Sequence, residues 1–145
     1  MKKRIFFIVS AVLVTLFIFG NSFKDAESST ESSKIFTNAI SNTLSRADKT
    51  VDSFTVTYFV RKTAHLMEFA LQGFLIAGCF SEKFKKRTLY VLLLGLLTAF
   101  TDEFIQHFSK GRAPMIRDVG LDFIGTILGL FVFFFAVKLL QKRKA

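Results

Sequence analysis

The sequence contains a single cysteine, a single proline and no tryptophan. Because Cys79 has no second thiol to pair with, an intrachain disulfide is excluded, and so is a metal site of the CxxC type. The missing tryptophan contrasts with 20 phenylalanines, and 51% of all residues are hydrophobic. This composition excludes an ordinary soluble domain.

Acidic residues are also few, 11 against 20 lysines and arginines, which gives a formal net charge of +9. Such a charge can indicate a nucleic-acid partner. Here, however, the charged residues sit in short clusters between apolar runs, which is typical of a membrane protein rather than of a basic groove. We therefore expect no nucleic-acid partner.

Four apolar runs are long enough to cross a bilayer core of about 30 Å. They predict one all-α membrane domain, residues 1–145, with transmembrane helices at about 4–23, 58–80, 88–108 and 118–140. A cleaved signal peptide is the alternative for the first run. Because no small-residue cleavage site clearly follows that run, we favour an uncleaved anchor.

A polar segment at about 24–57 separates the first two predicted spans. Its beginning, residues 25–33, is rich in Ser and Glu and predicts a flexible linker. Further along, apolar residues recur at helical spacing and predict an amphipathic helix, which lies either on the membrane surface or over the bundle. These residues are Phe36, Ile40, Leu44, Ala47 and Val51.

The distribution of basic residues predicts the orientation of the four spans. If both termini are cytoplasmic, the inner segments contain one acid, Glu82, and most of the basic clusters. Those basic residues are Lys2, Lys3, Arg4, Lys83, Lys85, Lys86, Arg87, Lys138, Lys142, Arg143 and Lys144. The segment at 24–57 is then extracellular, in a multi-pass membrane protein.

Three predicted spans share an unusual feature, which is a polar stripe along one face of the helix. The spacings follow the helical pattern of three and four residues. The stripes are Arg61, His65, Glu68 and Gln72, then Thr98, Asp102, Gln106 and Ser109, then Asp118, Asp122, Gly125 and Gly129. All the ionisable members fall in the outer halves of their helices, so we expect one shared polar pocket that opens outward, roughly 5–10 Å below the outer boundary.

Three interpretations of this cluster remain open. The charges can neutralise one another, with Asp118 capping the fourth span. In the second interpretation, the cluster binds a divalent metal ion, which would be zinc, manganese or magnesium. The candidate ligands are His65, Glu68, Asp102 and Asp122, and Asp118 can complete an oxygen-rich shell. In the third, basic residues at the rim bind an anionic headgroup. The predicted rim consists of Arg61, Lys62, Lys110, Arg112 and Arg117.

The same residues form a pattern of short motifs, and with them the chain resembles the VanZ-like family of small bacterial membrane proteins. The motifs are Arg61-Lys62-x-x-His65-x-x-Glu68-Phe69, Asp102-Glu103-x-x-Gln106-x-Phe108, Gly111-Arg112, and Asp118-Val119-x-x-Asp122-x-x-Gly125. Two positions depart from the family. Lys110 stands where many members have proline, and Ile105 stands where many have histidine, so no role is carried over to His107.

The resemblance implies action at the outer membrane surface, where lipid-linked cell-wall precursors reside, and an effect on susceptibility to teicoplanin or other lipoglycopeptides. We therefore expect a pocket for an anionic lipid-linked ligand, with membrane lipids, a wall precursor or the lipoglycopeptide as partner. The expected ligand-binding residues are Arg61, Lys62, Gln106, Arg112, Arg117 and Asp118.

The alternative is a membrane-embedded hydrolase or transferase that acts on a lipid or lipid-linked substrate through a metal ion or acid–base chemistry. Its candidate catalytic residues are His65, Glu68, Asp102 and Glu103. No serine nucleophile motif supports it. A transporter would usually need an internal repeat, which is not visible, and a purely structural partner of another membrane protein is the remaining option.

Overall fold

The computed structural model describes residues 2–46, 52–80, 84–112 and 115–143, and all regular structure in these residues is helical. The helices are α1 (Lys2–Ser22), α2 (Ala26–Arg46), α3 (Ser53–Cys79), α4 (Phe84–His107) and α5 (Ile116–Lys142). This confirms the all-α class. Val51 of the predicted amphipathic helix and Pro114 lie outside the described residues.

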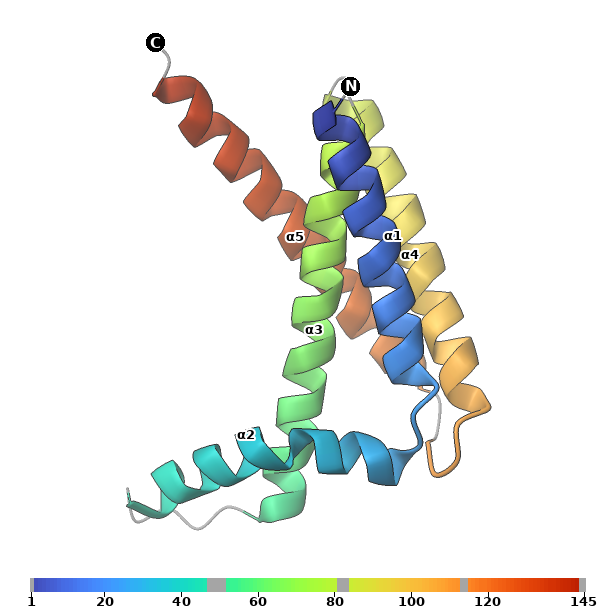
Figure 1. The fold of residues 1–145 in the computed structure, drawn as a ribbon, viewed down its shortest axis with the longest axis vertical. Helices are drawn as coiled ribbons and strands as arrows, with labels where there is room; N and C mark the ends of the chain where they lie inside the picture. Colours follow the sequence, from blue (N-terminus) through green and yellow to red (C-terminus); the bar gives the residue numbers. More distant parts are fainter. Residues whose placement is uncertain (1, 47–51, 81–83, 113–114, 144–145) are drawn as a thin grey trace.

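Four long helices form a bundle, and α2 lies across one end of it (Figure 1). Helices α1, α3 and α4 run side by side, whereas α5 crosses α3 and then diverges from it. Both ends of the chain lie at the end of the bundle opposite to α2 (Figure 1). Among the described residues, α1, α4 and α5 are long and apolar enough to cross a membrane.

Helix α3 is not one of these three candidates, although it is as long as α5. Arg61, Lys62, His65 and Glu68 lower its mean hydropathy. The other half of the helix is apolar, and its residues Leu75, Ile76 and Ala77 are buried. The structure therefore confirms three apolar helices of membrane-spanning length and shows that the second predicted span, 58–80, is a polar-faced helix in contact with each of the others.

Close approach of backbones fixes the crossing of α3 and α5. A Cβ atom at Gly125 would lie 2.5 Å from the carbonyl oxygen of Leu66, and one at Gly129 would overlap the carbonyl group of Ala70. On α3, Gly73 faces the backbone of Thr126 in the same way. The Gly125-x-x-x-Gly129 pattern thus serves a contact within the chain, since small residues let two membrane helices approach.

The core is divided along the bundle axis. Near the chain termini, buried apolar residues of the four long helices pack together, among them Ala11, Ile76, Val91 and Phe133. A second apolar layer, formed by Ile18, Phe69, Ala99 and Val119, lies closer to α2. Closer to α2, Val56 is a buried apolar residue, whereas Ser22, Asp102, Glu103 and Asp122 are buried and polar.

The prediction of a flexible linker at residues 25–33 was wrong, because α2 begins at Ala26. The Asp25 carboxylate accepts a hydrogen bond from the backbone nitrogen of Ser28 at 3.0 Å, as a helix N-cap does. Within the helix, the Thr30 and Ser33 hydroxyls donate to carbonyl oxygens one turn earlier. These bonds accommodate the Ser/Thr-rich sequence in a helix.

Helix α2 does not use its apolar residues to pack on the bundle. Thr37 is buried against α3, where its hydroxyl lies 3.4 Å from that of Thr57. Phe36 and Ile40, two members of the predicted apolar face, remain exposed. Packing on the bundle therefore does not account for the exposure of these two residues, and Ala47 and Val51 of the predicted apolar face lie outside the described residues.

Candidate functional site

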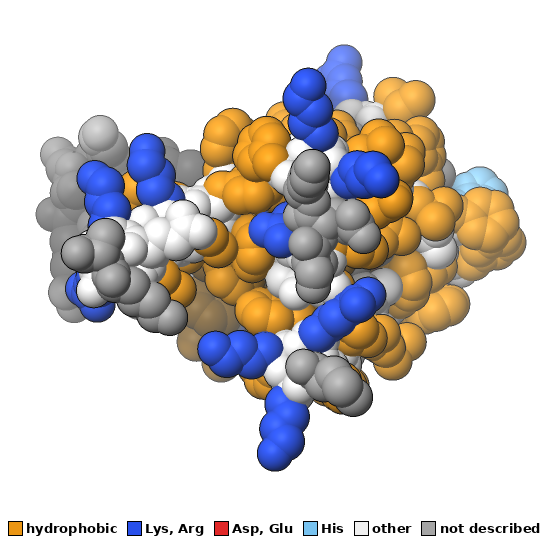
Figure 2. Space-filling view, turned by 90° about the horizontal axis from the view of Figure 1, so that it is seen from above, with side chains coloured by type: hydrophobic (Ala, Val, Ile, Leu, Met, Phe, Trp, Pro, Cys, Tyr) orange, Lys and Arg blue, Asp and Glu red, His pale blue; other side chains and the backbone are white. Residues whose placement is uncertain are grey.

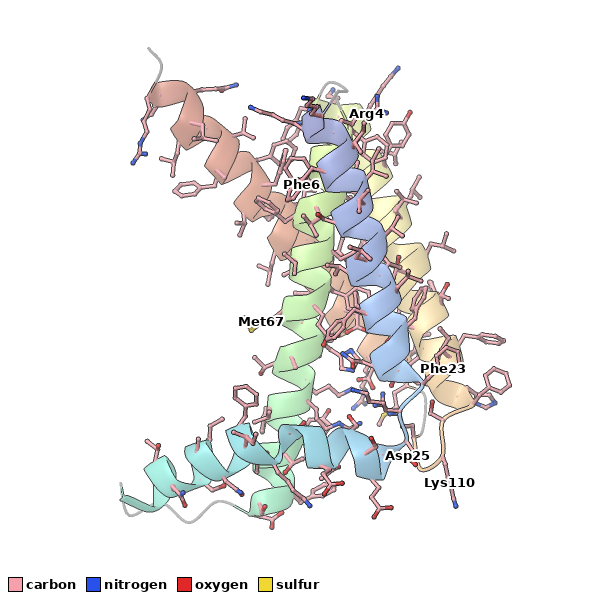
Figure 3. All side chains as sticks on the ribbon, viewed as in Figure 1. Arg4, Phe6, Phe23, Asp25, Met67 and Lys110 are labelled. Atoms are coloured by element: carbon pink, nitrogen blue, oxygen red, sulfur yellow. The ribbon has the colours of Figure 1, made fainter. Side chains whose placement is uncertain are left out.

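The three predicted polar stripes converge at the end of the bundle next to α2, and α1 contributes a fourth. Nitrogen- and oxygen-bearing side chains gather there between α1, α3 and α4, whereas Met67 on the outer face of α3 points away from the bundle (Figure 3). On α1, Ala11, Thr15, Ile18 and Ser22 repeat the helical spacing of the other stripes. The predicted single site is thus assembled from four helices.

Ser22, the last residue of α1, is the centre of the hydrogen bonds between α1 and α4. Its hydroxyl donates to Asp102 Oδ1 at 2.6 Å, and its carbonyl oxygen accepts from the Ser109 hydroxyl at 2.6 Å. Gln106 Nε2 donates to Asp102 Oδ2 at 2.7 Å and lies 3.4 Å from the Ser22 hydroxyl. Asp102 is fully buried, so these donors replace the water that its carboxylate loses.

Asn21, also on α1, binds the stripe of α3. Its Nδ2 donates to Glu68 Oε1 at 3.1 Å. The other oxygen, Oε2, lies 4.0 Å from His65 Nδ1, too far for a hydrogen bond. Both atoms are buried and, among the described residues, neither has a hydrogen-bond partner.

One turn deeper, Gln72 joins three helices. Its Nε2 donates to the Thr15 hydroxyl at 2.8 Å and to the Thr98 hydroxyl at 3.2 Å. Gln72 and Thr98 therefore connect α3 and α4 to α1 and do not line the space near α2.

Two acids of the predicted site are held by partners within the protein. Asp118 forms an ion pair with Lys62, with 2.5 Å between Oδ2 and Nζ. Glu103 Oε1 accepts a hydrogen bond from the backbone nitrogen of Met115 at 2.6 Å and so fixes the start of α5 against α4. Internal neutralisation thus accounts for part of the cluster, as the first interpretation requires.

The remaining polar groups surround a cavity of about 370 Å³, named here the α3–α5 cavity. Its apolar wall includes Phe54, Tyr58 and Met115. Its polar wall includes Arg61, Lys62, His65, Gln106, Arg112, Asp118 and Asp122. A second cavity of about 330 Å³, the α1–α3 cavity, shares Arg61, His65 and Arg112 with the first.

Arg112 is turned inward by the loop between α4 and α5. Gly111 has a φ of 74°, in the left-handed region that favours glycine, and the Arg112 backbone nitrogen donates to the Ser109 carbonyl oxygen at 3.2 Å. The guanidinium donates from Nη2 to the Asn21 carbonyl oxygen at 3.3 Å. Its Nε and Nη1 are buried and find no acceptor among the described residues.

Arg61 lies on the same cavity wall, and no hydrogen bond or ion pair of its side chain is found in the described part of the chain. Burial first, and the nearby Arg61 second, lower the pKa of Arg112 below its ordinary value. Two guanidinium groups thus face one cavity without a carboxylate bound directly to either.

The structure separates the predicted rim into two groups. Arg61, Lys62 and Arg112 line the α3–α5 cavity, whereas Arg117 and Lys110 are exposed and line neither cavity. Lys110 points away from the bundle (Figure 3). His107 is also exposed, with its ring against Phe108, which agrees with the decision to carry no family role over to it.

Of the predicted metal ligands, three come together. One ligand atom each of His65, Asp102 and Asp122 lie within 4.8 Å of one another. Glu68, the fourth candidate, lies beside His65 but outside this group. Residues from α3, α4 and α5 therefore each bring one ligand atom to the same region of the polar end.

Sequence reasoning missed the contribution of α1. Thr15, Asn21 and Ser22 each bond a stripe residue of another helix. The pattern was present in the sequence, since Thr15 and Ser22 are seven residues apart and therefore share a helix face. Uncharged residues in an apolar run draw little attention, because a membrane helix tolerates them on any face.

Comparisons with known proteins give one result. The family model described as VanZ/LLP1 matches residues 6–138, which include α2, α3 and α4, most of α1 and α5, and the residues that line both cavities. No curated protein and no solved structure gives a match.

Proposed function

This chain belongs to the VanZ/LLP1 family, and we propose that it is a cell-envelope membrane protein whose polar end binds an anionic, lipid-linked ligand in the α3–α5 cavity. Arg61 and Arg112 bind the anionic group, and the cavity wall of Phe54, Tyr58 and Met115 contacts the apolar part of the ligand. Gln106, on the same wall, is a further donor.

The observation that carries this proposal is that two donor atoms of the Arg112 guanidinium are buried without an acceptor among the described residues. A buried guanidinium with two unpaired donor atoms is costly unless an acceptor fills the space in front of it. Two oxygens of a phosphate group can each accept a hydrogen bond from the paired N–H donors of one guanidinium group. Lys62 is less suited to this role, because Asp118 already neutralises it.

We further propose that α3 is the fourth membrane span and that both chain ends are cytoplasmic. Helix α3 contacts α1, α2, α4 and α5, and its residues Arg61, Lys62, His65 and Glu68 are half-buried, which supports a span whose charged face turns toward the bundle. Figure 2 is a view onto the end that contains the termini, and the charged side chains that it shows among the described residues are lysines and arginines. Basic ends favour the cytoplasmic side, which places the α3–α5 cavity outside.

An outward cavity of this kind is suited to a lipid-linked cell-wall precursor. Binding such a ligand at the outer surface would alter the target of teicoplanin and related lipoglycopeptides, and lowered susceptibility to these antibiotics is the expected phenotype. Enzymatic turnover of the ligand is the second candidate function, favoured by the convergence of His65, Asp102 and Asp122 beside the cavity.

The experiment is a binding titration of undecaprenyl phosphate to the protein purified in lipid nanodiscs. Arg112→Ala should weaken binding at least about tenfold, because a hydrogen bond to a charged group contributes about 1.5–3 kcal/mol. Arg61→Ala should weaken it by a similar factor. Arg117→Ala is the matched control, since Arg117 is exposed and lies outside both cavities.

Equal affinity of the wild type and both cavity variants would overturn the proposal. Release of phosphate or of the isoprenoid alcohol during the titration, lost in Asp122→Asn, would favour the enzymatic function over binding alone.

A further inference from the structure

The polar end also contains a group of metal-ligating atoms that the binding of an anion does not use. His65 on α3, Asp102 on α4 and Asp122 on α5 each direct one ligand atom to a common point, with all separations within 4.8 Å. His65 and Asp122 line the α3–α5 cavity, and Asp102 is fully buried. The group therefore forms part of the cavity wall.

Asp122 supplies an independent observation. Its side chain is almost fully buried, with 3% of the residue exposed, yet its carboxylate makes no hydrogen bond or ion pair with any residue that the structure describes. Lys62 of α3, which lines the same cavity, is already paired with Asp118. A buried carboxylate without a partner is costly, and a bound cation removes that cost.

We propose that His65, Asp102 and Asp122 bind one divalent transition-metal ion, Mn²⁺ or Zn²⁺, at the wall of the α3–α5 cavity. One imidazole with two carboxylates suits these ions better than Mg²⁺ or Ca²⁺, which prefer oxygen ligands alone. Ligand atoms around a tetrahedral ion are about 3.3 Å apart at metal–ligand distances of about 2.0–2.1 Å. His65 Nδ1 has no hydrogen-bond partner among the described residues, so rotation of the imidazole and of the Asp122 carboxylate about their terminal torsions can shorten these separations while Asp102 stays in place.

The surroundings of the group support the assignment. Ser22 and Gln106 each donate to one oxygen of Asp102 and hold its carboxylate in place, as outer-shell donors do for metal ligands. Glu68 lies beside His65, with 4.0 Å between Oε2 and Nδ1. Because Ser22 and Gln106 already hold the Asp102 carboxylate, less conformational entropy is lost when an ion binds.

The ion has a role only if the function proposed above holds. Because Arg61, His65 and Arg112 line one cavity, an ion held by His65 lies on the wall that the anionic group contacts. The metal and the two guanidinium groups then share the oxygens of the phosphate. Ion binding itself does not depend on the ligand, so the two proposals can fail separately.

The test uses the full chain in nanodiscs, from which a chelator has removed bound metal. In one experiment the protein is titrated with Mn²⁺, and electron paramagnetic resonance measures free Mn²⁺. In another, elemental analysis measures the amount of bound Zn²⁺ per chain. The wild type should bind one ion per chain. His65→Ala and Asp122→Asn should each lower the affinity more than about 100-fold, since even outer-shell changes cost 10–100-fold. Asp52→Asn is the matched control, because it makes the same change at an exposed carboxylate that lines neither cavity.

Absence of stoichiometric binding would overturn the metal site, and so would equal binding by Asp122→Asn, which marks an adventitious ion only. Thermal unfolding without metal shows whether each variant is folded, and Asp122→Asn, which keeps the shape of the side chain, retains a test if His65→Ala does not fold. In Arg112→Ala, ion binding should persist while lipid binding is lost. Lipid binding without ion binding overturns the metal site alone, and ion binding without lipid binding overturns the proposed function alone.

Discussion

The two ends of the bundle are built from the same helices with the same spacing but contain opposite chemistry. Near the termini, Phe7, Phe74 and Phe133 stack at ring distances of 5.5–6.5 Å within an apolar core. Near α2, the corresponding faces present Ser22 and Asp102, which are buried and hydrogen-bonded. Helical spacing selects which face turns inward, and position along the axis determines whether that face is apolar or polar.

The difference indicates where function lies. Packing alone is enough to hold membrane helices together, and small residues at a crossing achieve it without charge. The polar end contains more ionisable groups than helix packing requires, although each such group inside a membrane-length helix costs free energy. The apolar end should therefore determine stability, and the polar end should determine ligand binding, with each largely independent of the other.

The largest effect is expected where α3 and α5 cross, because both ends depend on that contact. Gly129→Leu places a side chain against the backbone of Ala70 and should cost about 3 kcal/mol or more, at the upper end of overpacking penalties. Gly120→Leu, on the same helix with no atom within 4 Å of its added Cβ, should fold as the wild type does. Thermal unfolding in nanodiscs compares them, and equal midpoints would contradict the close crossing.

At the apolar end, Phe133→Ala should lower stability by about 3 kcal/mol, the lower bound for removing a core phenylalanine, because its ring contacts Phe7, Phe74 and Phe134. The affinity for undecaprenyl phosphate should not change. Unfolding midpoints and binding titrations on the same preparation check both expectations. A tenfold loss of affinity in Phe133→Ala would show that the two ends are not independent.

A smaller effect is expected for the same substitution at two positions of α1, one near its middle and one at its last residue. Ser22→Ala removes the donor to Asp102 and should cost about 1–3 kcal/mol, since it leaves a buried carboxylate oxygen unpaired. Ser10→Ala should cost less than about 0.5 kcal/mol, because no hydrogen bond of the Ser10 hydroxyl is found among the described residues. Unfolding midpoints that do not differ would contradict the polar network between α1 and α4.

The smallest effects are expected outside both cavities. His107→Ala should change stability by less than about 0.5 kcal/mol and should leave both lipid and metal binding unaltered, since its ring is exposed and contacts only Phe108 among the aromatic side chains described. Titration with undecaprenyl phosphate and with Mn²⁺ checks this. Loss of either ligand would assign His107 a role that its position does not explain.

Helical periodicity predicted correctly which faces of three helices turn inward. The reason is that the spacing of residues along a helix determines which side chains share a face, and this is sufficient to bring His65, Asp102 and Asp122 together. It could not predict the inward turn of Arg112, which depends on a left-handed glycine and on a carbonyl oxygen of Asn21 far away in the sequence. Nor could periodicity show that Arg112 lines the cavities and Arg117 does not, since both lie in one short segment between the predicted spans 88–108 and 118–140.

The helical start of α2 was missed for a different reason. Serine- and glutamate-rich composition is common to linkers and to solvated helices, and only the capping bond of Asp25 distinguishes them here. The loop after α4 adds a further contact, as the Ala26 backbone nitrogen donates to the Lys110 carbonyl oxygen at 3.1 Å. This pairing of two loops holds the start of α2 near the cavity and leaves no trace in a single sequence.

The most direct measurement of the central claim is a crystal structure of the protein grown with undecaprenyl phosphate. The account predicts phosphate density in the α3–α5 cavity, within hydrogen-bonding distance of Arg61 and of Arg112 Nε or Nη1. Density for the lipid elsewhere, with the Arg112 guanidinium paired to a carboxylate of the protein, would contradict it.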